Sequence, residues 1–168
     1  MPAAKPPAIY CYSHSGHTRR AAAALAARTG AEIVPVEVDR YRLPILWVIR
    51  AIWDVGRWRL PPLRTGNVVP AHRPWIVVAC PIWADQPAPP ARSVLVRLAG
   101  GSAPVGLLTT SGGSAEPVKG LRTCERVLGR SMVAHVNISN KTDGKPDMDQ
   151  RLATFADLMM SSPSQGAA

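Results

Sequence analysis

Three hydroxyl side chains surround a glycine near the start of the chain, namely those of Ser13, Ser15 and Thr18 around Gly16. An apolar run precedes this group and an alanine-rich run follows it, so we expect the group at a strand-to-helix junction. Its hydroxyls and the backbone N–H groups at the positive end of the helix would form a cradle for a phosphate, without a lysine or a metal. The alternative is an ordinary capped turn, but three hydroxyls exceed what capping needs.

Other phosphate-binding and catalytic motifs do not fit the sequence. It contains neither a Gly-x-x-x-x-Gly-Lys nor a Gly-x-Gly-x-x-Gly motif. Cys11 and Arg19 are too far apart for the Cys-x5-Arg loop of tyrosine phosphatases, and Ser15 lacks the glycine two positions earlier that a hydrolase nucleophile would have. His14 and His17 have no Asp or Glu beside them in the sequence that would complete a metal site. We therefore assign no catalytic residue and no metal ligand.

Apolar runs of strand length alternate along the chain with helical patterns. The expected strands are residues 8–12, 33–38, 75–80, 105–110 and 132–139. The expected helices are residues 18–28, 90–98, 118–128 and one capped by Asp147, with its apolar face at Met148, Leu152, Phe155 and Met159. Gly30 should cap the first helix, and Pro35 should confine the second strand to a sheet edge. The alternation predicts a doubly wound α/β fold, with helices on both faces of a five-stranded parallel sheet.

A basic, tryptophan-rich segment spans residues 40–64 and reads as helical. Pro44 could open a helix with an apolar stripe on one side and polar residues on another. The stripe comprises Ile45, Val48, Ile49 and Ile52, and the other side Trp47, Arg50, Asp54 and Arg57. We favour an arrangement in which the tryptophans Trp47, Trp53 and Trp58 pack on the sheet and the arginines Arg42, Arg50, Arg57 and Arg59 are solvated. The alternative is a surface that attaches to anionic membrane or nucleic acid.

Three polar loops follow the carboxyl ends of strands, where sheets of this class bind their ligands. They are residues 13–18, 81–88 and 110–116. The first loop resembles the phosphate loop of flavodoxins. CPIWADQPAPPARSVL is similar to their second flavin loop, and LLTTSGGSAEP to their third. The resemblance covers residues 8–160 and implies a flavodoxin-like fold with the strand order 2-1-3-4-5 and FMN as the cofactor.

The resemblance also implies which residues contact the flavin. Trp83 should lie against the ring, and the third loop should contact the ring edge through backbone groups. Asp85 stands where relatives commonly carry glycine. In those relatives the peptide at this position flips to form a hydrogen bond with N5 of the one-electron-reduced flavin, and glycine makes that change easier. The implied cofactor-binding residues are Ser13, His14, Ser15, Gly16, His17, Thr18, Pro81, Ile82, Trp83, Ala84, Asp85, Thr110, Ser111, Gly112 and Gly113.

The formal net charge of +9 bears on the partners rather than on the fold. Flavodoxins are typically acidic, so the resemblance together with this charge implies an FMN-binding electron-transfer protein whose redox partner has an acidic surface. The first alternative is an enzyme in which NAD(P)H reduces FMN and a small quinone or nitro compound reoxidises it. The second is a binding module of the same fold associated with membrane or nucleic acid.

Length and composition predict one domain in a reducing compartment. We expect a single domain over residues 8–160, with flexible tails at residues 1–7 and 161–168. The three cysteines Cys11, Cys80 and Cys124 form no Cys-x-x-Cys pair and read as buried, inert thiols rather than a disulfide framework or zinc site. No segment suits a signal peptide or a membrane span. These features predict a cytoplasmic protein.

Overall fold

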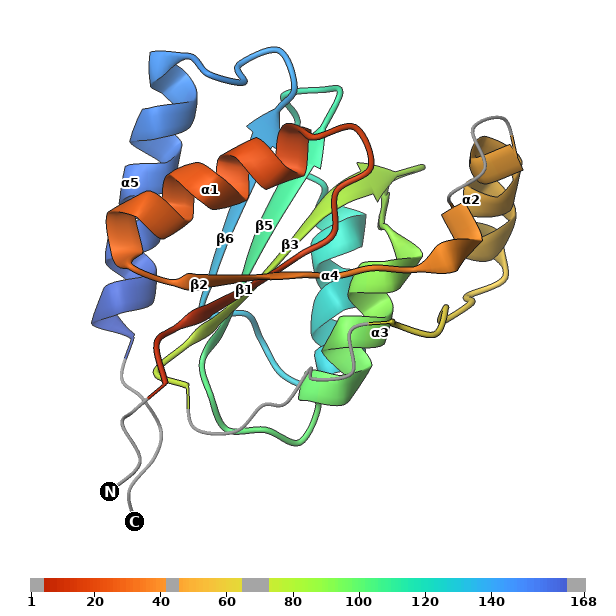
Figure 1. Cartoon of the computed structure of the whole chain (residues 1–168), viewed down its shortest axis with the longest axis horizontal. Helices are drawn as coiled ribbons and strands as arrows, with labels where there is room; N and C mark the ends of the chain where they lie inside the picture. The colour runs from red at the N-terminus through yellow and green to blue at the C-terminus, as the bar shows by residue number, and fades with distance from the viewer. Residues whose placement is uncertain (1–4, 42–45, 65–72, 163–168) are drawn as a thin grey trace.

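Five parallel strands form the centre of the computed structural model, which describes residues 5–41, 46–64 and 73–162. They are β1 (Ala8–Cys11), β2 (Glu32–Pro35), β3 (Ile76–Trp83), β5 (Val105–Ser111) and β6 (Ala134–Ser139). Their order is β2-β1-β3-β5-β6, which confirms the predicted doubly wound α/β fold and the strand order 2-1-3-4-5 (Figure 1). The short antiparallel strand β4 (Gln86–Pro87) pairs with the end of β3 and was not predicted.

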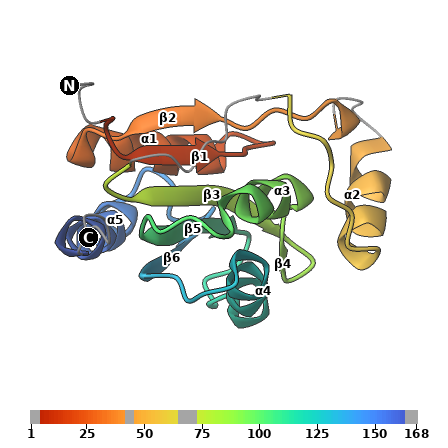
Figure 2. The same cartoon turned by 90° about the horizontal axis from the view of Figure 1, so that it is seen from below.

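Helices cover both faces of the sheet, as the alternation predicted. Helices α1 (His17–Thr29) and α5 (Pro146–Ser161) lie on one face, and α3 (Pro89–Leu98) and α4 (Val118–Leu128) lie on the other (Figure 2). Helix α2 (Leu46–Gly56), preceded by the 3-10 turn η1 (Asp39–Tyr41), stands beyond the sheet on the side to which the strands point (Figure 1). Each sheet face therefore has its own core, and α2 joins the edge of the core under α3 and α4 through Ala51.

Strand alternation divides the apolar residues between these two cores. Ile9 packs in the core under α1 and α5, whereas its neighbour Tyr10 packs in the core under α3 and α4. The predicted apolar face of the last helix is confirmed, because Met148, Leu152, Phe155 and Met159 are all buried. Gly30 ends α1 in the left-handed conformation and donates its N–H to the Ala26 carbonyl, as expected.

Two local predictions at element ends were wrong. Asp147 does not cap α5, because Lys145 is the N-cap and Asp147 lies inside the first turn. The third strand does not stop before Pro81 but runs on to Trp83. Tyr12 donates its N–H to the Ala79 carbonyl, so Ala79 and, two residues later, Pro81 face the side of β1. Because β1 has already ended at Cys11, Pro81 interrupts no pairing with β1, and its carbonyl accepts a hydrogen bond at 3.1 Å from the N–H of Ala88, just after β4.

Helix α2 is turned the opposite way from the prediction. The expected apolar stripe is exposed at Val48, Ile49 and Ile52, and the buried residues of the helix are Ala51, Asp54 and Val55. Trp47 is half-buried against the core, but Trp53 and Trp58 are exposed, so the predicted packing of the tryptophans on the sheet is wrong for these two. Pro44 and Ile45, as well as Arg42, lie outside the described residues.

A buried carboxylate explains this orientation of α2. Asp54 is fully buried and accepts hydrogen bonds from Arg40 Nη2 at 2.9 Å and from the Tyr41 hydroxyl at 2.8 Å. Burial alone would raise the pKa of Asp54, but the hydrogen bonds from Arg40 and Tyr41 outweigh burial and lower it. These hydrogen bonds determine which side of α2 faces inward, because breaking them while the charged Asp54 stays buried would destabilise the folded protein.

The three cysteines are free and buried, as predicted. Cys11 and Cys80 lie on neighbouring strands but in different cores, on opposite faces of the sheet. Burial raises the pKa of Cys11 and of Cys124 to about 12, and it raises the pKa of Cys80 as well. Thiols with such pKa values stay protonated near neutral pH and react slowly.

The described part of the predicted N-terminal tail contacts the rest of the domain. The carbonyls of Pro6 and Pro7 accept hydrogen bonds from Arg73 Nη1 and from the Glu32 N–H, so this part of the predicted N-terminal tail is attached to the sheet edge. Residues 1–4 and 163–168 lie outside the described residues. Within the described ranges, none of the helices combines the length and hydropathy needed to cross a bilayer.

Candidate functional site

The three predicted loops lie next to one another at the carboxyl edge of the sheet. Thr18, at the start of α1, and Thr110, near the end of β5, place their hydroxyl oxygens 2.7 Å apart in a buried position. Pro81 pairs in register with Thr110 across β3 and β5. The ring centroids of His14 and Trp83 are 6.4 Å apart. The topology therefore brings together residues that are about a hundred positions apart in the sequence.

The first loop turns sharply at Gly16, whose φ of 93° favours glycine. The Ser13 hydroxyl accepts hydrogen bonds from the N–H groups of Gly16, at 3.1 Å, and Arg19, at 3.3 Å. Among the described residues, the backbone N–H groups of Ser15, His17 and Thr18 have no hydrogen-bond acceptor. The loop thus offers several donors at the start of a 13-residue helix.

The donor set of this loop fits a phosphate group. The Ser13 hydroxyl already serves as an acceptor for two loop amides, which is the role that a phosphate oxygen plays at a helix N-terminus. Ser15 is exposed, so its hydroxyl is accessible to a ligand. The Thr18 hydroxyl differs from the prediction, because it points to Thr110 and is buried, which leaves the backbone N–H as the one donor of Thr18 without an acceptor among the described residues.

Asp143, which was not predicted from the sequence, contacts His17 and Arg20 in the first turn of α1. It follows β6, and its Oδ2 lies 2.6 Å from His17 Nδ1 and 2.8 Å from Arg20 Nε. The hydrogen bonds from Arg20 and His17 lower the pKa of Asp143. Its position at the carboxyl end of the last strand is the sequence signal that could have identified it.

The second loop is a tight hairpin between β3 and β4. Trp83 pairs with Gln86, and the two residues between them, Ala84 and Asp85, have φ values of 48° and 61°. Positive φ at both central positions is the geometry of a type I′ turn, which glycine and asparagine favour. Asp85 therefore adopts a glycine-like backbone conformation at the position where the sequence departs from the flavodoxin pattern. Its carboxylate lies 3.4 Å from Lys119 Nζ in an exposed pair.

Trp83 is half-buried within a cluster of aromatic rings at the mouth of the site. Its ring lies edge-on to Tyr12 at 5.8 Å and to Tyr41 at 5.5 Å between centroids. Trp47 of α2 is tilted against it at 5.7 Å. Trp47 also stacks on His14 of the first loop, with the centroids 3.9 Å apart and the planes inclined by 36°. The ring contact predicted for Trp83 thus belongs to a larger aromatic surface that includes α2.

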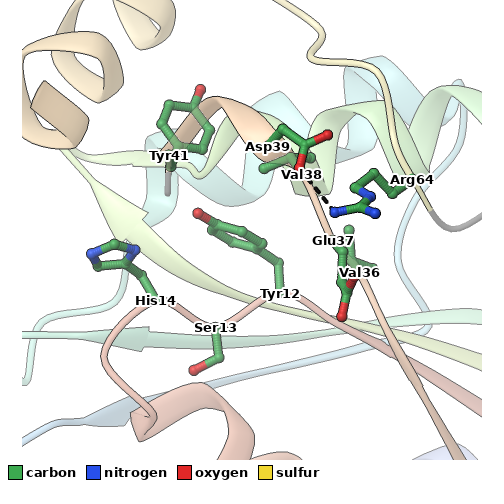
Figure 3. Close-up of a pocket in the computed structure, with 9 residues that line it drawn as sticks. All are labelled: Tyr12, Ser13, His14, Val36, Glu37, Val38, Asp39, Tyr41 and Arg64. Carbon is green, nitrogen blue, oxygen red and sulfur yellow. Dashed lines mark hydrogen bonds and ion pairs between the residues drawn. The ribbon is translucent and has the colours of Figure 1, made fainter. Parts of the chain in front are cut away.

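A cavity of about 380 Å³ opens beside the first loop (Figure 3). Ser13 and His14 line it from the end of β1, and Tyr12 and Tyr41 lie along one side. On the opposite side, Arg64 Nη1 donates to Asp39 Oδ1 at 3.0 Å. The cavity is large enough for a small molecule and shares Ser13 and His14 with the first loop.

The third loop exposes its backbone, as the flavodoxin resemblance implies. Gly112 and Gly113 are exposed, and the Ser111 hydroxyl donates to the Gly113 carbonyl at 2.8 Å. The buried Asn137 of β6 supports the loop by donating to Ser111 Oγ and to the Ala115 carbonyl, both at 3.1 Å. Across the ranges that the structure describes, no group of three or more His, Cys, Asp or Glu side chains is placed to hold a metal ion.

The fold is similar to that of solved flavoproteins. The flavoprotein of Lactobacillus acidophilus in complex with FMN matches with a TM-score of 0.69 and 18% identity, over 92% of this chain and 99% of that chain. A putative flavoprotein of Bacteroides uniformis matches with a TM-score of 0.72 and 18% identity, over 87% and 96%. Two-electron reduced Megasphaera elsdenii flavodoxin matches with a TM-score of 0.51 and 17% identity, over 94% and 99%.

Sequence comparisons add nothing to this similarity. No protein-family model matches the chain, and no curated protein matches its sequence significantly. The strand order, the two helical layers and the solved structures agree with one another, and the chain therefore adopts the flavodoxin-like fold.

Proposed function

We propose that this protein binds FMN at the carboxyl edge of its sheet and transfers electrons. The observation that carries the proposal is the first loop, where the N–H groups of Ser15, His17 and Thr18 converge at the start of α1 next to the Trp83 hairpin. This combination suits a phosphomonoester attached to a planar ring. The flavoproteins of the same fold, one of them in complex with FMN, support the choice of ligand.

Each loop has a distinct part in this proposal. The first loop holds the phosphate through its amides and the Ser15 hydroxyl, while Asp143 orients His17 and Arg20. Trp83 covers one side of the ring, and the exposed backbone at Gly112 and Gly113 lies beside the ring edge. FMN supplies the redox chemistry when bound, because it exchanges one or two electrons. The residues of the chain position the flavin and determine the charge around it.

The positive charge of the chain bears on both the cofactor and the partner. A net charge of +9 stabilises the anionic, fully reduced flavin, so its reduction potential should be less negative than in acidic flavodoxins. It also favours a redox partner with an acidic surface, whose association slows as salt rises. Association kinetics measured over a range of salt concentrations test this partner, and rates independent of salt would contradict it.

Titration of the purified protein with FMN and with riboflavin tests the proposed site directly. Both should alter the absorption spectrum of the flavin, and FMN should bind more tightly because only FMN has a phosphate. Ser15→Ala should weaken FMN binding about tenfold, as expected for one hydrogen bond to a charged group, and leave riboflavin binding unchanged. Ser102, exposed before β5 at the opposite end of the sheet, provides the matched control Ser102→Ala. Failure of FMN to bind, or equal binding of both flavins, would refute the phosphate cradle.

The cavity beside the first loop favours a second candidate function. Its volume of about 380 Å³ can admit part of a second small molecule next to His14, as an enzyme that oxidises NAD(P)H and reduces a quinone or nitro compound requires. Steady-state oxidation of NADPH by the FMN-loaded protein with an added quinone distinguishes the two functions. Rapid turnover favours the reductase, and slow turnover favours simple electron transfer.

A further inference from the structure

Helix α2 presents large apolar side chains to solvent. This outward face consists of Leu46, Val48, Ile49, Ile52 and Trp53, which are 43 to 64% exposed. Trp58 and Leu60, which follow the helix, are 44 and 45% exposed. Single exposed apolar residues are common on protein surfaces, but a contiguous set of this kind is typical of an interaction surface.

Polar anchors hold the helix in this orientation. Besides Asp54, the anchors come from α3, where Arg92 is fully buried and its Nη1 donates to the Val55 carbonyl at 3.4 Å. The guanidinium carbon of Arg92 lies 4.4 Å from the centre of the Trp58 ring, and the Ser93 hydroxyl donates to the Pro61 carbonyl at 2.8 Å. Rotating the helix to bury its isoleucines would break these contacts. The outward face is therefore built into the fold.

The surroundings of the outward face are positively charged. Residues 40–64 contain six arginines and one carboxylate, and that carboxylate, Asp54, is fully buried. The guanidinium of Arg57 lies 3.9 Å above the ring of Trp53, in a cation–π contact. Next to the helix, Arg40, Arg50 and Arg64 line a cavity of about 450 Å³, in which Asp39 is the one acidic lining residue among those described. Exposed aliphatic and indole side chains are thus interspersed with exposed arginines.

We propose that the outward face of α2 docks on the surface of an anionic lipid bilayer. Its aliphatic side chains would enter the boundary of the acyl chains, its tryptophans would lie at headgroup level, and its arginines would pair with lipid phosphates. The helix has 11 residues, about half of what a span requires, so it lies on the membrane and does not cross it. The argument for this proposal does not rest on the proposed FMN site.

Charge and side-chain type favour a lipid surface over other occupants. A second copy of the chain would bring the same arginines against each other, which is unfavourable. Nucleic acid would satisfy the arginines but would leave Val48, Ile49 and Ile52 without an apolar environment. An anionic bilayer satisfies both the charge and the apolar surface.

Vesicle co-sedimentation tests the proposal with two kinds of vesicle, phosphatidylcholine alone and phosphatidylcholine mixed with phosphatidylglycerol. We expect binding to the mixed vesicles that decreases with salt, and much weaker binding to the neutral ones. The double variant Ile49→Ser and Ile52→Ser should lose at least tenfold in partition coefficient. Its control, Val96→Ser and Leu158→Ser, changes two apolar residues on α3 and α5 that are 45 and 50% exposed, and it should bind like the unchanged protein.

Two arginine variants distinguish docking through the outward face of α2 from a general attraction of the positively charged protein to anionic vesicles. Arg57→Gln should weaken the partition coefficient about fivefold, which corresponds to ~1 kcal/mol per arginine at the membrane surface. Arg122→Gln on α4 removes the same charge from another exposed position and should have little effect. Equal losses in the two variants would contradict docking through α2, as would no binding to anionic vesicles at low salt. If the unchanged protein forms a dimer in solution and the double isoleucine variant is a monomer, a second copy of the chain occupies the face and the proposal is overturned.

Discussion

The hydroxyl oxygens of Thr18 and Thr110 lie 2.7 Å apart in the interior, although 92 residues separate them in the sequence. This hydrogen bond joins the start of α1 to the end of β5 and so fixes the first loop against the third. Because both side chains are buried, neither hydroxyl can turn to water if its partner is removed.

We predict a non-additive effect of valine at these two positions. Thr18→Val or Thr110→Val alone leaves one buried hydroxyl unpaired and should cost about 1 to 3 kcal/mol in the free energy of unfolding. The double variant removes both hydroxyls and should cost less than the sum of the single changes. Urea unfolding of the four proteins measures the coupling. Strictly additive costs would show that the hydrogen bond does not stabilise the fold.

Replacing Ala84 by glycine should stabilise the protein. Ala84 has a φ of 48°, and a residue with a Cβ in the left-handed region costs roughly 1 to 2 kcal/mol. Ala84→Gly should therefore raise the free energy of unfolding by about 1 kcal/mol, even after the entropy that glycine adds to the unfolded chain. Ala23→Gly, at an exposed position inside α1, should lower it by about 1 kcal/mol. The same sign for both changes would contradict the strained turn.

The buried carboxylate of Asp54 should make the protein sensitive to acid. Its pKa is lowered in the folded protein, so the stability it contributes is present above the ordinary carboxyl pKa of about 4 and is lost as the pH falls through the lower folded value. Asp54→Asn should cost about 3 kcal/mol at neutral pH, because it leaves Arg40 without its charged partner.

The pH dependence distinguishes this ion pair from a loss of packing. The difference in unfolding free energy between Asp54→Asn and the unchanged protein should shrink as the pH falls from about 4 through the lower folded pKa, because the carboxylate is protonated first in the unfolded chain and then in the folded protein. Asp157→Asn, at an exposed position of α5, should change the free energy of unfolding by less than about 0.5 kcal/mol at any pH. A difference that stays constant as the pH falls would show that the charge of Asp54 is unimportant.

Trp83 should quench the fluorescence of bound FMN. Aromatic rings in contact with a flavin quench its emission, so Trp83→Leu should make the bound flavin brighter than in the unchanged protein. Trp53→Leu removes an exposed indole on the outward face of α2 and should leave the emission as it was. Equal brightness in the two variants, with FMN bound in both, would place the ring away from Trp83.

The sequence predicted the regular elements well because their signals are local. Strands such as β1 and β3 are continuous apolar runs, and the face of α5 repeats at helical spacing. The first loop was recognisable because hydroxyls and glycine gather within six residues. The cofactor contacts of these loops remain predictions, which the FMN titration and the Trp83 variant test.

The errors arose where distant residues determine the structure. In α2 the pattern of isoleucines predicted the wrong inward side, because Asp54 finds Arg40 and Tyr41 on the preceding 3-10 turn and becomes the buried residue. Pro81 did not end β3, because the neighbouring strand had already stopped. Asp143 went unnoticed, since only the fold places it beside His17 and Arg20.

The stacking of His14 on Trp47 joins the phosphate loop to α2 by direct contact between two rings. An event that tilts the helix therefore shifts the histidine, and a ligand that displaces the histidine pushes on the helix. Through this contact, binding of a nucleotide at the loop and docking of the helix would each affect the other. Trp47 would be the side chain that passes a change at one of these sites to the other.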